Sequence, residues 1–361
     1  MNGLYLVYGD IKGSLGVKKK VKAQVDALNS LGINCDLFKV QSFPNKYRKV
    51  LQRLPYGLTY KKWIDCEKIK DLDFLYIRKP IIDYQFIQDL KKIKKTKSNI
   101  KILLEIPTFP YDQELSRFVD YPLLIKERIN RKKLIEYVDR IITFSDDDEI
   151  FNIKTIKTQN GININEIKLR KISTKDNVIN LLAVASVQKW HGYDRLIKGI
   201  ADYYKKNPKI EVHFYLVGDG KELPILKKLT ENLNVSKYIH FEGFKSGNEL
   251  DKFYNICHIG IGSLGLHRIG LTHASTLKNR EYCAKGLPFI ITAYDNDFPG
   301  NFKYVYKLPQ NEQPINIESI IDFYKSIYNE KNFTLKMREY AENYLSWEAK
   351  MKPVACFLEE E

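Results

Sequence analysis

Short apolar segments alternate with amphipathic segments along almost the whole of this 361-residue chain. This alternation restricts the fold more than any other feature, because it favours parallel sheets whose right-handed crossovers carry helices on both faces. The segments with the apolar character of buried strands begin at residues 3, 33, 74, 101 and 140, and again at 179, 211, 238, 259 and 287. Between the first two of them, residues 16–32 have the pattern of a helix with Val17, Val21, Val25 and Leu28 on one stripe and Gly32 at its end. The sequence therefore predicts an α/β fold.

The chain is long enough to form two ordinary cores, since 44% of its 361 residues are hydrophobic. We expect the break near residues 158–167, where Asn160-Gly161 is a turn signal and an unpatterned polar stretch follows to about Asn177. Two such domains joined by one linker leave a cleft between the carboxyl ends of their sheets, where α/β proteins bind ligands.

No apolar run approaches the roughly 20 residues that a membrane span needs, and "MNGLYLVYGD" is too short for a signal peptide. We therefore expect a cytosolic protein. The five cysteines are scattered, without a CxxC pair or a histidine at metal-ligand spacing, which predicts reduced thiols and neither zinc nor disulfides.

The positive charge is concentrated in the first half of the chain. Of 59 Lys and Arg and 44 Asp and Glu, residues 1–160 hold 31 and 20, a balance of +11, and the remainder carries +4. Two interpretations stay open: solvated helix faces, or contact with an anionic membrane. For the membrane, residues 46–63 interleave basic side chains with Leu51, Leu54, Tyr56, Leu58, Tyr60 and Trp63. Nucleic acid is disfavoured, because no known binding module is present.

Polar residues of the second half cluster where strands end and helices begin. Gly218 and Gly220 let a backbone approach a flat ligand, and Lys189, His191 and Arg195 supply positive charge or donors. Ser275 or Thr276 can cap a helix that starts at Leu277, and such a helix terminus attracts phosphate, as does Lys278. Glu281 suits paired ribose hydroxyls. The other interpretation is that these residues only cap ordinary helix starts and place charges that suit the helix dipoles, without binding a ligand.

Several segments occur in a characteristic order: "GSLGVKKKVKAQVDALNSLG" (13–32), "VASVQKWHGYDRLIKGI" (184–200), "FYLVGDGKELPILKKL" (214–229), "YIHFEGFKSGNELDKFYNICHIGIGSLG" (238–265) and "HASTLKNREYCAKGLPFI" (273–290). As a set they resemble the retaining glycosyltransferases of family 4, and "WHGYDR" and "LKNREY" resemble its polysaccharide-assembly branch. The resemblance implies the GT-B fold, with two Rossmann-like domains facing across a cleft. It also implies metal-independent transfer of a sugar from a nucleoside diphosphate sugar, without a further cofactor.

The resemblance divides the chain into an acceptor domain (1–163), a donor domain (164–340) and a C-terminal helix (341–361) that crosses back after "LSWEAK". Gly16 lies in the glycine loop of the family and Glu281 in its ribose-binding position. The other glutamate of the family's pair, which contacts the sugar, falls on His273. Val187 and His191 stand where the family holds the diphosphate with Arg and Lys, so Lys278 and Lys189 are our candidates for that charge, and Lys278 and His273 for catalysis.

The first domain is expected to hold the acceptor. Residues 103–115 leave a strand through two prolines and carry Glu105, Thr108, Asp112 and Glu114, with Glu105 also a candidate for catalysis. Arg78 follows the preceding strand and is expected at the same edge. A tightly turned loop without a binding role is the alternative for this segment.

Two tempting motifs are discounted. "SDDDE" (145–149) resembles a metal-binding triplet, but Ser145 can cap a helix whose first turn holds the acids. His213 and His240 fall in strand patterns and are expected to be half-exposed or satisfied sheet residues.

The sequence thus predicts a glycosyltransferase that acts on a growing bacterial surface glycan, such as capsule or exopolysaccharide, with a glycan or lipid-linked acceptor at the inner face of the membrane. Two other classes stay open. A nucleotide-sugar epimerase shares the fold, and a non-catalytic partner subunit is suggested by His273 and the missing diphosphate arginine.

Overall fold

The computed structural model describes all residues other than 9–14, 44–46, 48–53, 55–59, 63–65, 113–117, 173–176 and 361, and omits the side chains of residues 15, 42, 61, 62 and 66. The chain divides into two compact units: residues 1–160 with Trp347–Glu361, and Gly161–Ser346. Among the described residues, no helix combines the length and the apolar character that a membrane crossing requires.

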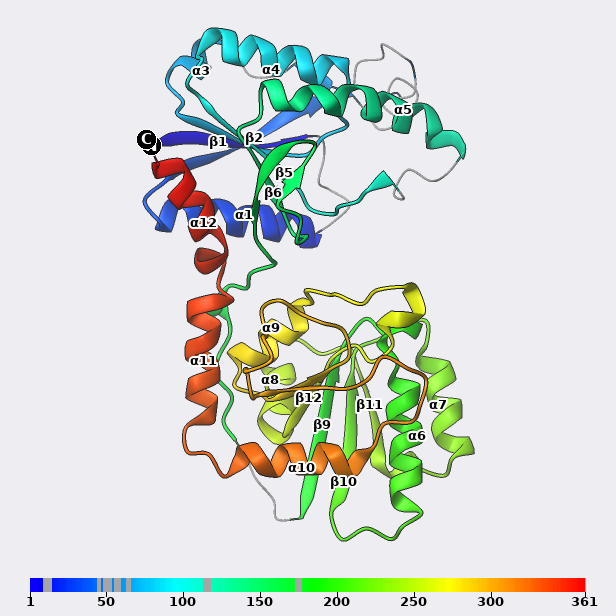
Figure 1. The fold of residues 1–361 in the computed structure, drawn as a ribbon. Coiled ribbons are helices and arrows are strands. Elements are labelled where there is room, and N and C mark those ends of the chain that lie inside the picture. The colour runs from blue at the N-terminus through cyan, green and yellow to red at the C-terminus, as the bar shows by residue number, and fades with distance from the viewer. Residues whose placement is uncertain are drawn as a thin grey trace. The chain divides into compact units, whose positions relative to one another are not determined.

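The first unit is built on an eight-stranded sheet of order β3-β2-β1-β4-β5-β6-β8-β7, drawn in Figure 1. All neighbouring strands pair in parallel except β3 with β2 and β7 with β8. Its strands are β1 Asn2–Tyr8, β2 Asn34–Ser42, β3 Tyr60–Lys62, β4 Phe74–Arg78, β5 Lys101–Ile106, β6 Arg140–Thr143, β7 Glu149–Ile150 and β8 Ile153–Lys157. Its α-helices are α1 Leu15–Ser30, α3 Cys66–Lys70, α4 Tyr84–Thr96, α5 Tyr121–Asn130 and α12 Trp347–Glu359, and short 3-10 turns are η3 Phe118–Asp120 and η4 Arg131–Glu136.

Both faces of this sheet are covered by apolar helix stripes, because successive side chains of a strand point to opposite faces. Tyr5 and Val7 of β1 pack with Val21 and Leu28 of α1, and α12 joins this layer through Met351, Val354 and Leu358. On the other face Leu6 packs with the stripe of α4, which comprises Phe86, Ile87, Leu90 and Ile93. The last residues of the chain are therefore part of the first unit.

The second unit has a six-stranded, entirely parallel sheet of order β11-β10-β9-β12-β13-β14. Its strands are β9 Val178–Val184, β10 Glu211–Val217, β11 Ile239–Gly243, β12 Ile259–Ile261, β13 Phe289–Ile291 and β14 Val305–Lys307. Its helices are α6 Tyr193–Tyr204, α7 Leu223–Asn232, α8 Gly247–Ile256, α9 Leu277–Ala284, α10 Ile317–Tyr328 and α11 Phe333–Tyr344, with the 3-10 turns η5 Ile164–Glu166, η6 Lys189–His191, η7 Ser236–Tyr238 and η8 Leu266–Ile269.

Two apolar layers enclose the second sheet as well. The stripes of α6 and α10, among them Leu196, Ile200 and Ile320, pack with Leu181 and Phe214 on one face. The stripes of α9 and α11, among them Tyr282, Cys283 and Met337, pack on the other face. The carboxyl ends of the strands then lie along one edge of the sheet, and the loops that follow them share that edge.

The ten strands and the first helix that the sequence predicts are all present. In α1, Val21, Val25 and Leu28 are buried as expected, and Gly32 ends the turn with a φ of +86°. His213 and His240 lie on adjacent strands with ring nitrogens 2.9 Å apart, which confirms them as satisfied sheet residues. The described Cys35, Cys257, Cys283 and Cys356 are free thiols.

One local prediction is wrong. The acids after Ser145 do not begin a helix, because Glu149–Ile150 is β7 and pairs antiparallel with β8. The two residues between these strands, Phe151 and Asn152, both have positive φ, which is the backbone of a tight hairpin turn.

Candidate functional site

The loops after β9 and β10 form the first part of the carboxyl edge of the second sheet. A Cβ on Gly218 would lie 1.9 Å from the Ala185 carbonyl oxygen, and one on Gly220 would lie 2.1 Å from that of Val187. The Val187 amide also donates to the Asp219 carbonyl at 2.7 Å. The two glycines of the predicted donor loop are therefore required by close backbone packing, and this packing fixes both loops.

The N-terminus of α9 forms the second part of this edge. Thr276 occupies the N-cap position with extended backbone, as the sequence predicts, but its hydroxyl does not cap the helix. Its Oγ1 is buried and has no hydrogen-bond partner among the residues that the structure describes. The helix begins at Leu277, directly after Ser275 and Thr276, so first-turn N–H groups and a hydroxyl are left for a ligand.

Lys278 lies in the first turn of α9 and reaches Tyr193, the first residue of α6. Its Nζ is 3.3 Å from the Tyr193 hydroxyl and 5.7 Å from the centre of that ring. Burial alone lowers the pKa of Lys278 to about 7, and no ion pair joins Lys278 to any described residue. A desolvated lysine that has no carboxylate partner gains stability when an anionic ligand binds beside it, because the ligand favours the charged form.

His191 lies beside the same tyrosine, with ring centres 5.4 Å apart. Its Nδ1 accepts the Gln188 N–H at 3.0 Å, so the proton of the neutral ring is on Nε2. Burial and the nearby charge of Lys278 lower the pKa of His191 to about 3. Of the two contributions expected from His191, positive charge or a hydrogen-bond donor, the neutral ring retains the Nε2–H donor, and the cation beside Tyr193 is Lys278.

Glu281 follows Lys278 by one turn of the same helix and is half-buried. Burial raises its pKa, and the charge of Lys285 opposes that effect. Its carboxylate makes no hydrogen bond to a residue in the described ranges. A carboxylate in this state can accept two hydroxyl groups, as a ribose offers.

Two arginines of this region serve the fold. Arg195, which we expected to offer charge in the cleft, is 1% exposed and donates to the carbonyl oxygens of Leu264, Gln313 and Pro309. Arg280 is buried in ion pairs with Asp295 and Asp297. The expectation for Arg195 is therefore wrong.

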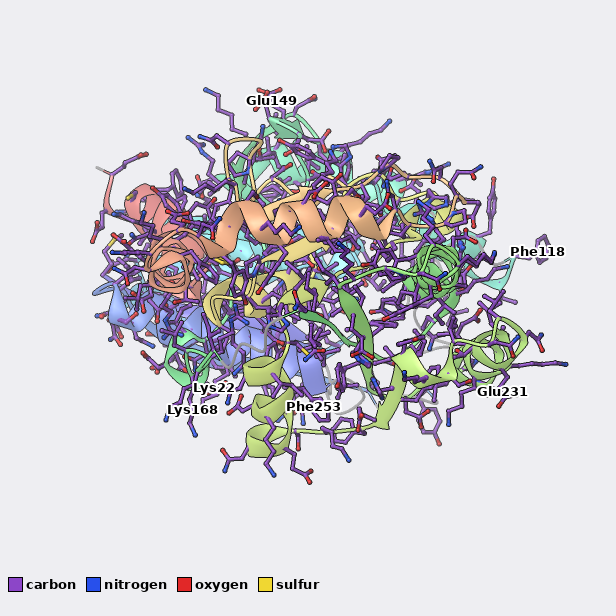
Figure 2. The ribbon with its side chains drawn as sticks, turned by 90° about the horizontal axis from the view of Figure 1, so that it is seen from below. Lys22, Phe118, Glu149, Lys168, Glu231 and Phe253 are labelled. Atoms are coloured by element: carbon purple, nitrogen blue, oxygen red, sulfur yellow. The ribbon has the colours of Figure 1, made fainter. Side chains whose placement is uncertain are left out.

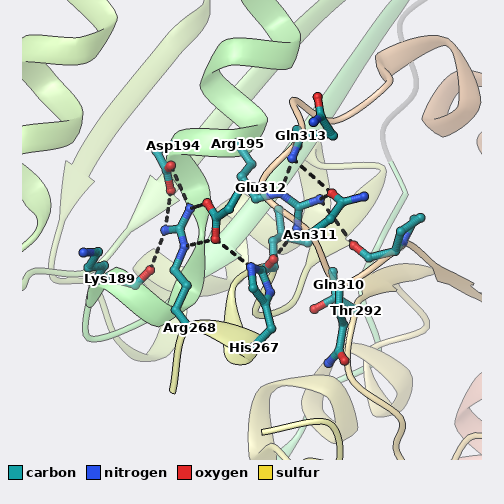
Figure 3. Close-up of polar contacts among 12 residues, drawn as sticks. Lys189, Asp194, Arg195, His267, Arg268, Thr292, Gln310, Asn311, Glu312 and Gln313 are labelled. Carbon is teal, nitrogen blue, oxygen red and sulfur yellow. Dashed lines mark hydrogen bonds and ion pairs between the residues drawn. The ribbon is translucent and has the colours of Figure 1, made fainter. Parts of the chain in front are cut away.

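A network of ion pairs, which the sequence did not indicate, fastens the loop after β12. Arg268 donates to both carboxylate oxygens of Asp194, at 2.8 and 2.9 Å, and also binds Glu312, as Figure 3 shows. His267 meets the same Glu312, and the Lys189 carbonyl accepts from Arg268 at 2.9 Å. The Lys189 side chain itself is exposed. The network joins the start of α6, η8 and the loop after β14.

A pocket of about 450 Å³ opens at the carboxyl ends of β13 and β14 and is lined in part by the segment that leads into α9. It contains His273, which is exposed and whose ring centre is 5.2 Å from that of Tyr294. The lining residues are Thr272, His273, Thr292, Tyr294, Lys307, Leu308, Pro309 and Gln310. His273 thus lies on the same edge of the sheet as the N-terminus of α9.

In the first unit, Glu105 is placed differently from our expectation. It is fully buried, and its oxygens accept from Tyr5, Gln24 and Tyr76 and meet Arg78 and Lys20. Burial acts to raise the pKa of Glu105, but Lys20, Arg78 and the hydrogen bonds outweigh it and hold that pKa below its usual value. A carboxylate enclosed in this way anchors Arg78 and is not open to an acceptor, so a direct catalytic role does not fit.

The other acceptor candidates differ in access. The side chain of Arg78 is 18% exposed beyond its pair with Glu105. Thr108 is exposed, and Asp112 pairs with Arg128 and Arg131 at 2.8 and 2.6 Å, which lowers its pKa. Glu114 lies outside the described residues. Gly16 lies near the start of α1, and among the described residues no atom beyond its chain neighbours and its own helix backbone lies within 4 Å of the place of a Cβ.

The residues of the second-unit site lie within a segment that matches the model of a sequence family. Residues 165–343 match the family model described as glycosyl transferases group 1. The alpha-monoglucosyldiacylglycerol synthase of Acholeplasma laidlawii is 29% identical to this chain over 128 residues, which are 36% of this chain. The match spans only 30% of the length of that relative.

Solved structures extend the similarity to both units. A glycosyltransferase from Rickettsia africae has a TM-score of 0.61 at 14% identity and covers 99% of this chain and 97% of its own. Anabaena HepE in complex with UDP has a TM-score of 0.60 at 13% identity, and 99% of each chain is covered. At these identities the similarity shows the fold, and the chain has the two parallel-sheet α/β domains of GT-B glycosyltransferases.

Proposed function

We propose that the protein is a glycosyltransferase that takes a sugar from a nucleoside diphosphate sugar and adds it to a growing bacterial surface glycan. The observation that carries the proposal is the arrangement on α9: a half-buried Lys278 without a carboxylate partner, one turn before the half-buried Glu281. These residues lie within the segment that matches group 1 glycosyl transferases, and a neighbour in fold was solved with UDP.

In this proposal the donor binds along the carboxyl edge of the second sheet. Glu281 accepts hydrogen bonds from the ribose, while Lys278, Thr276 and the amides at the start of α9 hold the diphosphate. The leaving group gains negative charge as the glycosidic bond breaks, so fixed N–H donors and a protonated lysine stabilise the transition state more than the bound donor. We further propose transfer with retention and without a metal.

A panel of nucleotide sugars tests this function. Release of nucleoside diphosphate and formation of a glycosylated acceptor, followed by mass spectrometry, are expected with one donor and a membrane-derived acceptor fraction. Lys278→Ala should reduce turnover strongly, whereas Lys325→Ala, an exposed lysine of α10, should leave it unchanged. Unchanged turnover in Lys278→Ala would exclude the role given to this residue.

A non-catalytic partner subunit is the second candidate, favoured by the chemistry of two positions. Val187 is fully buried and His191 is neutral at pH 7, so neither supplies the cation expected there. Nucleotide-sugar binding without transfer or hydrolysis across the panel would support this candidate over the enzyme.

We assign the acceptor to the first unit, with Arg78 and Thr108 as its candidate contacts, and the membrane to a surface of the same unit. Phe118, Tyr121, Ile125 and Ile129 are 94%, 57%, 46% and 59% exposed, and the last three follow each other at a spacing of four on α5. Figure 2 shows Phe118 pointing outward. An apolar helix stripe in a half-chain with a charge of +11 fits an anionic bilayer.

The segment first considered for the membrane, residues 46–63, lies mostly outside the described residues. Tyr60 belongs to the core and donates to Asp89 at 2.6 Å, so it does not contact lipid, whereas Leu54 is exposed. Binding to anionic vesicles should fall in Ile125→Ser/Ile129→Ser, and Ile225→Ser, an equally exposed isoleucine on α7, is the control. Equal binding to neutral and anionic vesicles would contradict the charge contribution.

A further inference from the structure

The pocket beside α9 contains a positively charged side chain and no carboxylate among its lining residues. Its lining contains one lysine, Lys307, and one histidine, His273, together with two threonines, a tyrosine and a glutamine, and it contains no Asp or Glu. Lys307 is exposed, with Nζ 4.8 Å from the centre of the Tyr294 ring, and it forms no ion pair with any described residue.

The acidic residues that neighbour the pocket lining in sequence form ion pairs with arginines. Asp295, directly after Tyr294, is 3% exposed and pairs with Arg280 at 3.0 Å. Glu312, two residues after Gln310, pairs with Arg268 and His267 in the network of Figure 3. Both acids are occupied by these ion pairs and lie outside the lining, so Lys307 has no carboxylate partner among the pocket residues, and a ligand carboxylate there is attracted.

His273 adds directional donors to this charge. Its Nδ1 and the Thr272 hydroxyl are 3.0 Å apart. Its Nε2 has no hydrogen-bond partner among described residues, so the exposed edge of the ring is available to a ligand. The backbone at this point is fixed, because the Ala274 amide donates to the Tyr294 carbonyl at 2.9 Å and the Tyr294 amide donates to the Thr272 carbonyl at 2.8 Å.

From this chemistry we propose that the transferred sugar carries a carboxylate, as a hexuronic acid does. The inference rests on the proposed function, because it places the sugar of the donor in the pocket next to the diphosphate-binding end of α9. Lys307 pairs with the sugar carboxylate and His273 donates to it or to a neighbouring hydroxyl. A neutral hexose leaves the lysine without a partner, and the pocket then discriminates between sugars that differ only at this carboxylate.

Calorimetric titration of matched donors tests the proposal with the full chain. UDP-glucuronate is compared with UDP-glucose, GDP-mannuronate with GDP-mannose, and free UDP and GDP serve as references. We expect the acidic member of one pair to bind at least tenfold more tightly than its neutral partner. Lys307→Met and His273→Glu should each remove this preference while binding of the free diphosphate stays within twofold, and Lys325→Met should change neither.

Different results would overturn the sugar assignment and the proposed glycosyltransferase function. Binding of UDP or GDP with no preference for the acidic sugar would overturn the sugar assignment and leave the proposed function standing. A preference that survives in Lys307→Met and in His273→Glu would also overturn it. Failure of every nucleotide and every nucleotide sugar to bind would refute the proposed function itself, and the sugar assignment with it.

Discussion

Binding of a nucleoside diphosphate is predicted to take up a proton on Lys278. In the free protein burial lowers the pKa of this lysine to about 7, so about half of the molecules carry the charge at pH 7 and about a tenth at pH 8. A phosphate charge about 4 Å away stabilises the protonated lysine by about 4 kcal/mol at an effective dielectric constant of about 20. This energy corresponds to about 3 pKa units, so the pKa of Lys278 in the complex should be about 10.

The pKa values of Lys278 in the free protein and in the complex set how strongly affinity depends on pH. Affinity is constant below the free pKa and falls as pH rises between the free and the bound pKa. From pH 7 to pH 9 the dissociation constant should therefore increase about 50-fold, and at pH 8 each binding event should take up about 0.9 proton. The groups in contact with Lys278 do not titrate in this range, because the pKa of His191 is lowered to about 3 and burial raises that of Tyr193 well above 10.

Calorimetry at pH 8 in buffers of different ionisation enthalpy measures this uptake. The diphosphate contributes little, because its last proton dissociates near about pH 6. Lys278→Arg keeps a charge at every pH, so its titrations should show binding without uptake and a nearly flat pH dependence. The reasoning is refuted if the native protein takes up no proton, or if Lys278→Arg takes up as much as the native protein.

Three further perturbations have distinct outcomes. Lys278→Met should raise the free energy of unfolding at pH 7 by about 1–3 kcal/mol while it weakens nucleotide binding. Between pH 7 and pH 10.5 the lysine binds more protons in the unfolded chain than in the folded chain, so the native protein gains stability as pH rises through this range. The difference in stability between Lys278→Met and the native protein, measured by urea titration, should therefore shrink over the same range. Gly218→Ala should cost more than about 3 kcal/mol, because its Cβ meets the Ala185 carbonyl. Gly243→Ala should cost about 1 kcal/mol, because Gly243 also has positive φ but, its chain neighbours aside, no described atom lies within 4 Å of its Cβ. Equal midpoints of unfolding for the two variants would contradict the close packing at Gly218. Glu105→Gln should cost about 3–5 kcal/mol by leaving Lys20 and Arg78 without their carboxylate. It should also reduce the loss of stability at acid pH, because the lowered pKa of Glu105 contributes stability that is complete above about pH 4.5 and is lost as pH falls through the pKa of the folded protein.

Local periodicity was sufficient to predict ten of the strands and the first helix, because each depends on neighbours within a few residues, but it did not indicate the short strands β3, β7 and β14 or the strand β8. The N-terminus of α9 was predictable for the same reason, since Thr276, Lys278 and Glu281 lie within one and a half turns. The hairpin after Ser145 was missed because its turn residues, Phe151 and Asn152, adopt positive φ without a glycine to indicate it.

The charged clusters were missed because their partners are distant in sequence. Glu105 ends a strand like a typical exposed polar residue, but the residues that bury it lie 29, 81 and 100 positions away, as Tyr76, Gln24 and Tyr5. Arg268 likewise depends on partners 74 and 44 positions away. Which cation faces a ligand and which one holds the fold is set by such long-range pairs, and therefore by the topology of the sheet.

In the proposed enzyme, α9 holds a nucleoside diphosphate through Glu281 and Lys278. Calorimetric titration with nucleoside diphosphates at pH 7 tests it most directly, with Glu281→Ala beside Glu231→Ala, a change in an exposed glutamate of α7. The account predicts one-to-one binding of at least one nucleoside diphosphate, weakened more than tenfold in Glu281→Ala and unchanged in Glu231→Ala. Equal affinity in the native protein and Glu281→Ala, or the absence of binding for every nucleoside diphosphate, would contradict it.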